Sequence, residues 1–304
     1  MTTKEKIKLA LVDSKYRKFQ IVKTFAKCFS DRHYLELIFP LRAGYQLNLD
    51  NPQTFNEKLQ WLKLYDHRPE YTQMVDKVEA KKYVSKIIGE EYIIPTLAVY
   101  ERAEEIDFEA LPNQFVLKCS HDSGGIVICK DKSTLNRKSV VRRLSRGIGK
   151  DYYYQNREWP YKNVKPRIIA EQYMSDLGSE IDDYKVHNFN GTPKFVLLCR
   201  DRYKKTGLTE DFYDTEWNHL DIKRPGHPQA NENVPKPEKL HEILRLASKL
   251  SEGIPFVRSD FYIIGNKVYF GELTFFPAGG MRPFIPSKWD KTFGDWITLP
   301  NKNY

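Results

Sequence analysis

Apolar residues recur along the chain with either a helical or a strand period. The helical period predicts several helices. Thr54-Phe55-Asn56-Glu57 has the form of a capping box, which predicts a helix through residues 58–61. Helical spacing also runs from Asp76 to about Ile88, and from Leu240 to Leu250 before a glycine stop. Residues 137–167 are basic and aromatic, and they indicate a further helix followed by an irregular connection.

Short runs rich in β-branched and aromatic residues predict strands at 115–119, 126–129 and 168–174. Two longer stretches predict β-hairpins. One spans 183–201 and turns at Asn190-Gly191, and the other spans 256–274 and turns near Gly265-Asn266. Since helices and strands do not alternate regularly, we predict an α+β fold rich in antiparallel hairpins.

Composition and charge restrict the class of protein. The 304 residues carry a formal charge of +9, which favours an anionic partner such as a nucleotide, a uronic-acid glycan, nucleic acid or an acidic membrane surface. The N-terminal residues lack the uninterrupted apolar core of a signal peptide, and no later segment approaches the length of a membrane span, so we expect a cytoplasmic protein, with peripheral membrane contact left open. The four scattered cysteines lack a CxxC pair and are expected to be reduced and mostly buried.

The last hairpin carries the sharpest chemical signal. Because strand side chains alternate between faces, Arg258 and Asp260 share one face, as do Glu272 and Thr274 on the return strand. Two carboxylates on adjacent strands can converge to hold Mg²⁺ together with substrate phosphates. A solvated hairpin is the alternative, but the aromatic residues around it disfavour that interpretation.

Arg-Ser-Asp-Phe, Gly-Glu-Leu-Thr and Pro-Ala-Gly-Gly closely resemble the metal hairpin of ATP-grasp ligases such as D-alanine–D-alanine ligase. The resemblance implies that Asp260 and Glu272 ligate Mg²⁺ and that Arg258 steadies the acyl-phosphate and tetrahedral intermediates. Thr274 stands where those ligases usually place asparagine, so the resemblance leaves both one and two Mg²⁺ ions open.

Other motifs of the same superfamily follow in the expected order. Asp76-Lys77 resembles the entry to the first nucleotide lysine, and the strand ending at Lys118 resembles the carrier of the second. The resemblance implies a glycine-rich phosphate loop at 120–125, an adenine hinge at 171–174, and ribose and phosphate contacts from the next hairpin. The expected ATP ligands are Lys77, Lys118, Ser120, Ser123, Gly124, Gly125, Glu171, Tyr173, Met174 and Asp183, with Lys185 and Arg200 beside Arg258 as catalytic cations.

At family level the chain resembles the TupA-like ATP-grasp group, on Asn51-Pro52-Gln53-Thr54-Phe55-Asn56-Glu57-Lys58, Pro112-Asn113-Gln114-Phe115, Asp183-Tyr184-Lys185 and Phe212-Tyr213-Asp214. This implies an ATP-grasp fold, in which two α+β lobes with antiparallel sheets hold the nucleotide between them. We divide the chain into an N-terminal helical region (1–75), a small lobe with the glycine-rich loop and hinge strand (76–175) and a large lobe with the metal hairpin (176–304).

The function implied is an ATP- and Mg²⁺-dependent carboxylate–amine ligase, which joins an amine to a uronic acid or amino acid in surface-polysaccharide synthesis. A glycosyltransferase is one alternative, but it leaves the two lysines, the glycine loop and the hinge without a role. A non-catalytic glycan-binding protein is another, suggested by Trp159 and the tyrosines at 152–154. No nucleic-acid partner is expected, because no recognised binding motif accompanies the charge.

Overall fold

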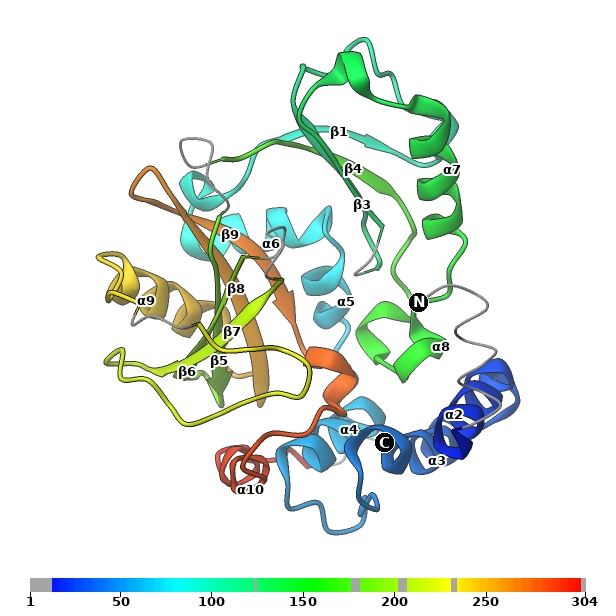
Figure 1. Cartoon of the computed structure of the whole chain (residues 1–304), viewed down its shortest axis with the longest axis vertical. Coiled ribbons are helices and arrows are strands. Elements are labelled where there is room, and N and C mark those ends of the chain that lie inside the picture. The colour runs from blue at the N-terminus through cyan, green and yellow to red at the C-terminus, as the bar shows by residue number, and fades with distance from the viewer. Residues whose placement is uncertain (1–12, 123–124, 176–180, 202–206, 231–233, 302–304) are drawn as a thin grey trace.

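The protein is described from a computed structural model, which covers residues 13–122, 125–175, 181–201, 207–230 and 234–301. Within these ranges the chain forms two antiparallel sheets with helices around them (Figure 1). The helices are α2 (Ser14–Thr24), α3 (Asp31–Ala43), α4 (Phe55–Tyr65), α5 (Glu70–Val75), α6 (Glu79–Ile88), α7 (Arg137–Ile148), α8 (Tyr153–Asn156), α9 (Leu240–Leu250) and α10 (Lys288–Asp295).

The smaller sheet has the order β1-β4-β2-β3 and lies at the top of Figure 1, with α7 along one side. Its strands are β1 (Thr96–Tyr100), β2 (Phe115–Cys119), β3 (Ile126–Cys129) and β4 (Ile168–Gln172). A separate apolar core, drawn from residues 103–170, fills the space between this sheet and α7. Leu117 and Ala170 of the sheet and Leu144 of α7 are completely buried in it.

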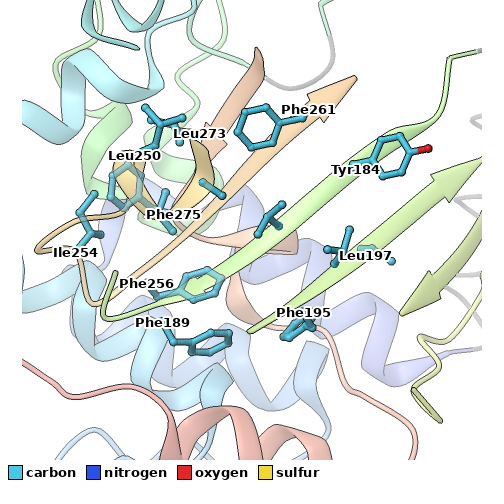
Figure 2. Close-up of a cluster of buried hydrophobic side chains, with 14 of the residues drawn as sticks. Tyr184, Phe189, Phe195, Leu197, Leu250, Ile254, Phe256, Phe261, Leu273 and Phe275 are labelled. Carbon is cyan, nitrogen blue, oxygen red and sulfur yellow. The ribbon is translucent and has the colours of Figure 1, made fainter. Parts of the chain in front are cut away.

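The larger sheet has the order β7-β6-β5-β8-β9. Its strands are β5 (Asp183–Phe189), β6 (Thr192–Arg200), β7 (Thr209–Asp214), β8 (Phe256–Ile264) and β9 (Lys267–Thr274). Helix α9 packs on β5, β6 and β8, and the main core continues into α4, α5, α6 and α10. Figure 2 shows how Phe189, Phe195 and Phe256 gather at one end of this sheet.

Helices α4 and α10 close that apolar end. Phe55 of α4 contacts Phe256 edge to face, and its ring centroid lies 6.1 Å from that of Phe293 on α10. The buried carboxylate of Asp290 accepts hydrogen bonds from the amide of Asn56 (3.0 Å) and the hydroxyl of Tyr45 (2.7 Å). The ammonium of Lys58 donates to the carbonyl of Ile297 across 239 residues of sequence. Helix α4 and the C-terminal segment that contains α10 are thereby tied together.

The predicted α+β architecture with antiparallel sheets is confirmed. The capping box forms, with Thr54 and Glu57 each accepting the other's amide hydrogen bond. Asn190 and Gly191 both have positive φ angles, as a two-residue hairpin turn between Phe189 and Thr192 requires. Cys119, Cys129 and Cys199 are buried and free, as predicted, while Cys28 is exposed.

Several boundaries differ from those predicted. Strand β4 ends at Gln172, two residues early, and strands β1 and β7 were not predicted. Helix α6 falls in the predicted small lobe, yet Val84 and Ile88 pack into the main core. The division at residues 75 and 175 stays a prediction. In the described part of the chain, no helix is long and apolar enough to cross a membrane.

Candidate active site

Strands β5, β8 and β9 place charged side chains in two neighbouring rows on one face of the larger sheet. Lys185, Asp260 and Glu272 pair directly across the three strands. His187, Arg258 and Thr274 form the next row. Residues paired across antiparallel strands share a face, so all six side chains point to the same side of the sheet.

A β-bulge turns Glu272 toward this face. The register of β8 with β9 shifts between Phe261–Phe270 and Asp260–Glu272, which leaves Gly271 as the extra residue. Without this shift Asp260 would pair with Gly271, and Glu272 would point to the opposite face. A Cβ atom on Gly271 would lie 3.1 Å from the Asp260 carbonyl oxygen, so a residue without a side chain suits the bulge.

Arg258 connects both rows. Its Nε and Nη2 atoms donate to the two carboxylate oxygens of Asp260, each at 2.6 Å. Nη2 also lies 3.0 Å from both Glu272 Oε1 and Thr274 Oγ1. Burial lowers the pKa of Arg258, but Asp260 and then Glu272 outweigh it and raise that pKa above its ordinary value. The guanidinium is therefore a fixed positive charge.

Lys185 completes the first row. Its ammonium pairs with the carboxylates of Asp260 and Asp183. Burial lowers the pKa of Lys185, but the two carboxylates reverse the effect and raise it. His187 is 4% exposed, its Nδ1 donates to the Lys185 carbonyl, and its ring stacks on Phe195. These contacts make His187 a structural residue at the border between the charged rows and the aromatic core.

The donor set around Glu272 fits Mg²⁺. Burial opposes ionisation of Glu272, yet Lys77, Arg258 and Lys185 lower its pKa to about 2, so the side chain is a carboxylate. Asp260 lies directly opposite, and the Thr274 hydroxyl donates to Glu272 at 3.1 Å. No group of three His, Cys, Asp or Glu side chains gathers at metal-binding distance in the ranges described. Two carboxylates are enough for Mg²⁺, which takes its remaining ligands from phosphates and water.

Two lysines meet at Glu171 on the smaller sheet. The Glu171 carboxylate lies 2.6 Å from Lys81 Nζ and 2.5 Å from Lys118 Nζ. Although burial opposes ionisation, Lys118 and Lys81 lower the pKa of Glu171 to about 2. Glu272 and Asp183 of the larger sheet also help to raise the pKa of Lys118, so charged groups of the two sheets face each other. The predicted ligands omitted Lys81, although it follows four residues after Lys77.

The loop after β2 is only partly described. Lys77 Nζ donates to the Asp122 carbonyl at 2.5 Å, and the Lys77 amide donates to the Ser120 carbonyl. The Ser120 hydroxyl is occupied by the backbone of Lys165 and Arg167. Gly125 is packed so tightly that a Cβ atom would lie 2.6 Å from Cys119 Sγ. Ser123 and Gly124 lie outside the described residues.

The predicted hinge at 171–174 begins with the last two residues of β4. Tyr173 and Met174 are partly buried and continue the chain directly after Gln172. Tyr262 of β8, which sequence reasoning missed, pairs with Asp183 and shares its face. The nearby carboxylate of Asp183, followed by burial, raises the pKa of Tyr262 well above its ordinary value. The phenol is thus a neutral hydrogen-bond donor among carboxylates.

Arg200 was predicted as a catalytic cation together with Lys185 and Arg258, but it does not lie in the two charged rows. Asp183 pairs with Cys199, so Cys199 shares the face of Asp183, and Arg200 points to the opposite face beside Tyr184 and Tyr213. The cause is a register shift between His187 and Asn188, where Lys194 is the extra residue. Without that bulge Arg200 would lie on the same face of the sheet as Lys185. Arg202, its neighbour on the same hairpin, is outside the ranges that the structure describes.

The sequence matches one family model, described as TupA-like ATPgrasp, over residues 57–298. No curated protein matches it. Among solved structures, the chain is similar to the ATP complex of D-alanine–D-alanine ligase from Bacillus anthracis, with 15% identity and a TM-score of 0.41. That match covers 66% of this chain and 54% of the ligase, so the chain spans about half of the ligase's length.

Two further solved structures are similar at the same level. The D-alanine–D-alanine ligase from Helicobacter pylori shows 14% identity and a TM-score of 0.41, with 80% of this chain and 69% of the ligase covered. The ATP-grasp ligase PsnB, in complex with minimal precursor, Mg and ADP, shows 12% identity and a TM-score of 0.38, with 72% and 57% covered.

Proposed function

Because the chain belongs to the TupA-like ATP-grasp family, we propose that it is an ATP-dependent carboxylate–amine ligase working through an acyl phosphate. The carboxylate is a uronic acid or an amino acid, and the product belongs to surface-polysaccharide synthesis. The enzyme works in the cytoplasm, where ATP is available. The family match carries the ATP-grasp assignment, and the sheet geometry supports the reaction.

One observation carries the proposal: the row of Lys185, Asp260 and Glu272 beside the row of Arg258 and Thr274. This arrangement combines a carboxylate pair for a metal ion with a buried, permanently charged arginine fork. A fork of this kind can bind the oxygens of a phosphate or of an acyl phosphate with two hydrogen bonds at once.

The reaction then follows from charge placement. Lys77, Lys118 and Lys185 hold the ATP phosphates while a carboxylate oxygen of the substrate attacks the γ-phosphorus, and the bond from that phosphorus to ADP breaks. Arg258 stabilises the negative charge on the transferred oxygens. The amine then attacks the activated carbonyl carbon, loses a proton and displaces phosphate. No serine or cysteine nucleophile is required.

Asp260 and Glu272 are the residues that would hold Mg²⁺, with Thr274 beside them. When bound, the ion neutralises charge on the phosphates. Arg258 pairs with both carboxylates and Lys185 pairs with Asp260, so both cations lie beside the place where the ion would be held.

The experiment offers ATP, Mg²⁺, hydroxylamine and a panel of uronates and amino acids to the purified protein. A small strong nucleophile should intercept the acyl phosphate, so we expect a hydroxamate whose yield depends on both ATP and one carboxylate. Asp260→Asn and Glu272→Gln should each lower that yield at least about a hundredfold, because each removes a carboxylate that would hold Mg²⁺, whose positive charge stabilises the transferring phosphoryl group.

Arg258→Lys is the matched variant, because it keeps the charge but loses the fork. We expect it to lower hydroxamate yield while ATP affinity stays nearly unchanged. ADP release that depends on a carboxylate but gives no hydroxamate would count against an amide ligase. Sugar transfer from a nucleotide sugar without ATP hydrolysis would instead favour a glycosyltransferase.

A further inference from the structure

Three arginines from distant parts of the chain converge beside the segment that follows β9. Arg42, in the last turn of α3, donates to the Ala278 carbonyl (2.8 Å) and to Asn156 Oδ1 (2.7 Å). Arg282 donates to the Pro225 carbonyl at 2.6 Å. Arg224 is held nearby because Lys223 and Ile285 form a two-way backbone bridge.

This cluster of Arg42, Arg224 and Arg282 is short of negative charge. Arg224 forms a two-pronged pair with Glu210 at 2.7–2.8 Å. Within the described ranges, neither Arg42 nor Arg282 has a carboxylate within ion-pair distance. The buried Glu158 acts on Arg42 only at longer range. The cluster thus holds two guanidiniums without an ion-pair partner.

The guanidiniums of Arg224 and Arg42 also repel that of Arg282. Burial lowers the pKa of Arg282, and Arg224 and Arg42 lower it further against the opposing effect of Glu210. Like charges held together in a partly buried site destabilise the free protein, and a bound anion removes that repulsion. The arrangement is therefore understandable as a binding site for negatively charged oxygens.

The cluster borders on the catalytic rows. Phe212 of β7 pairs with Leu197, which pairs with Lys185, so Phe212 lies in the same row as Lys185 and Asp260. The Arg224 guanidinium lies 5.8 Å from the Phe212 ring centroid. Arg42 contacts the turn at Pro277–Gly280 that follows β9. A ligand bound at Arg224 would therefore lie on the side of the sheet that carries the catalytic rows.

We propose that Arg42, Arg224 and Arg282 bind a second anionic group of the carboxylate substrate, one that is not activated. The substrate then carries at least two negative groups, and the remote one is a carboxylate or a phosphate. This inference rests on the proposed ligase function for its meaning, but the binding site itself can be tested without turnover.

The test titrates trigalacturonate into protein saturated with Mg²⁺ and a non-hydrolysable ATP analogue, using calorimetry. Galactose 1-phosphate is the phosphate probe, and the methyl ester of trigalacturonate is the uncharged control. We expect an anionic probe to bind wild type and to weaken about tenfold or more in Arg282→Gln and Arg42→Gln, because each change removes charge-assisted hydrogen bonds. The probe that shows this loss identifies the remote group.

Arg143→Gln is the matched control, because Arg143 is an exposed arginine on α7, far in sequence from the cluster. It removes the same charge and should leave the affinity unchanged. Arg282→Lys, which keeps the charge, should bind more weakly than wild type but better than Arg282→Gln. The melting temperature and its rise with MgATP show that each variant is folded.

The two proposals fail in different ways. Arginine-dependent probe binding without any hydroxamate would overturn the ligase and leave the anion site standing. Hydroxamate formed equally well from substrates with one and several negative groups, with no effect of Arg282→Gln, would overturn the anion site and leave the ligase standing. Equal probe affinity in Arg143→Gln and Arg282→Gln would also overturn it.

Discussion

At the scale of single residues, Glu171 holds two buried lysines together, and Lys118 is one of the cations proposed to bind the ATP phosphates. Lys81 and Lys118 would repel each other in a buried position if no anion lay between them. Glu171 supplies that anion, and its own pKa falls to about 2 as a result. Under the proposed function, the ATP phosphates would join an ion-pair network that already exists.

Glu171→Gln should lower the free energy of unfolding by about 3 kcal/mol at pH 7, on the basis of the depressed pKa of Glu171. The stabilisation from a depressed carboxyl pKa is present above the ordinary value of 4.5 and is lost as pH falls toward 2. The gap between wild type and variant in urea denaturation should therefore shrink over that range. A gap that is constant from pH 7 to pH 3 would contradict this account.

Residue identity and strand alternation predict which side chains of one strand share a face. They do not predict the β-bulges, which change the face of the residues that follow. In any regular strand, residues two apart share a face, so Asp183 lies on the same face as Lys185, and Arg258 on the same face as Asp260. The extra residue at Gly271 turns Glu272 inward, and the extra residue at Lys194 turns Arg200 outward. Since a bulge depends on how two strands fit together, no count along one strand could place both side chains.

At the scale of elements, α7 approaches β2 unusually closely. A Cβ atom on Gly147 of α7 would lie 2.5 Å from Cys119 Sγ. That sulfur is fully buried, and it also faces Gly125 and the Leu144 carbonyl. Glycine inside a helix normally weakens it, so here close packing outweighs helix propensity.

Gly147→Ala should therefore lower the free energy of unfolding of the smaller lobe by about 1–2 kcal/mol, although alanine favours helices. Gly149→Ala is the matched control at the end of the same helix, where the nearest atom to an added Cβ is the Ser145 carbonyl oxygen at 3.6 Å. Thermal unfolding of both variants decides the matter. Cys119→Ala should restore stability to Gly147→Ala, and equal stability of the two single variants would refute the packing argument.

The elements themselves were predicted where local signals were strong. The capping box at Thr54 and the Asn190-Gly191 turn specify their own geometry, and both form as predicted. Strand β1 was missed because Leu97, Ala98, Val99 and Tyr100 show no polar–apolar alternation, although Leu97 is 39% and Val99 41% exposed. Its position is set by pairing with β4, which local sequence does not encode.

At the scale of the whole molecule, the two sheets have separate apolar cores but share one set of charges. Lys118 and Glu171 belong to the smaller sheet, whereas Asp183 and Glu272 belong to the larger one. A nucleotide that contacts both sets should stabilise both lobes together. A ligand that contacts only one of the two sets should stabilise only the lobe to which that set belongs.

Hydrogen exchange can measure this coupling. MgATP should slow exchange in β2 and β4 as well as in β8 and β9, since a ligand that binds only the native state stabilises what it contacts. Mg²⁺ alone should protect only β8 and β9, near Asp260 and Glu272. Lys118→Ala should lose the protection of β2 and β4 by MgATP while keeping that of β8 and β9. Protection confined to one lobe in wild type would disprove the coupling.

The pairing of α4 with α10 sets an order of events during synthesis. Lys58 and Ile297 are separated by 239 residues, and a ribosome adds about 5–20 residues each second, so α4 waits on the order of 10–50 s for its partner. During that time the apolar face around Phe55 has nothing from α10 to cover it. The capping box of Thr54 and Glu57 needs only neighbouring residues, so it favours the first turn of α4 while the rest of the chain emerges.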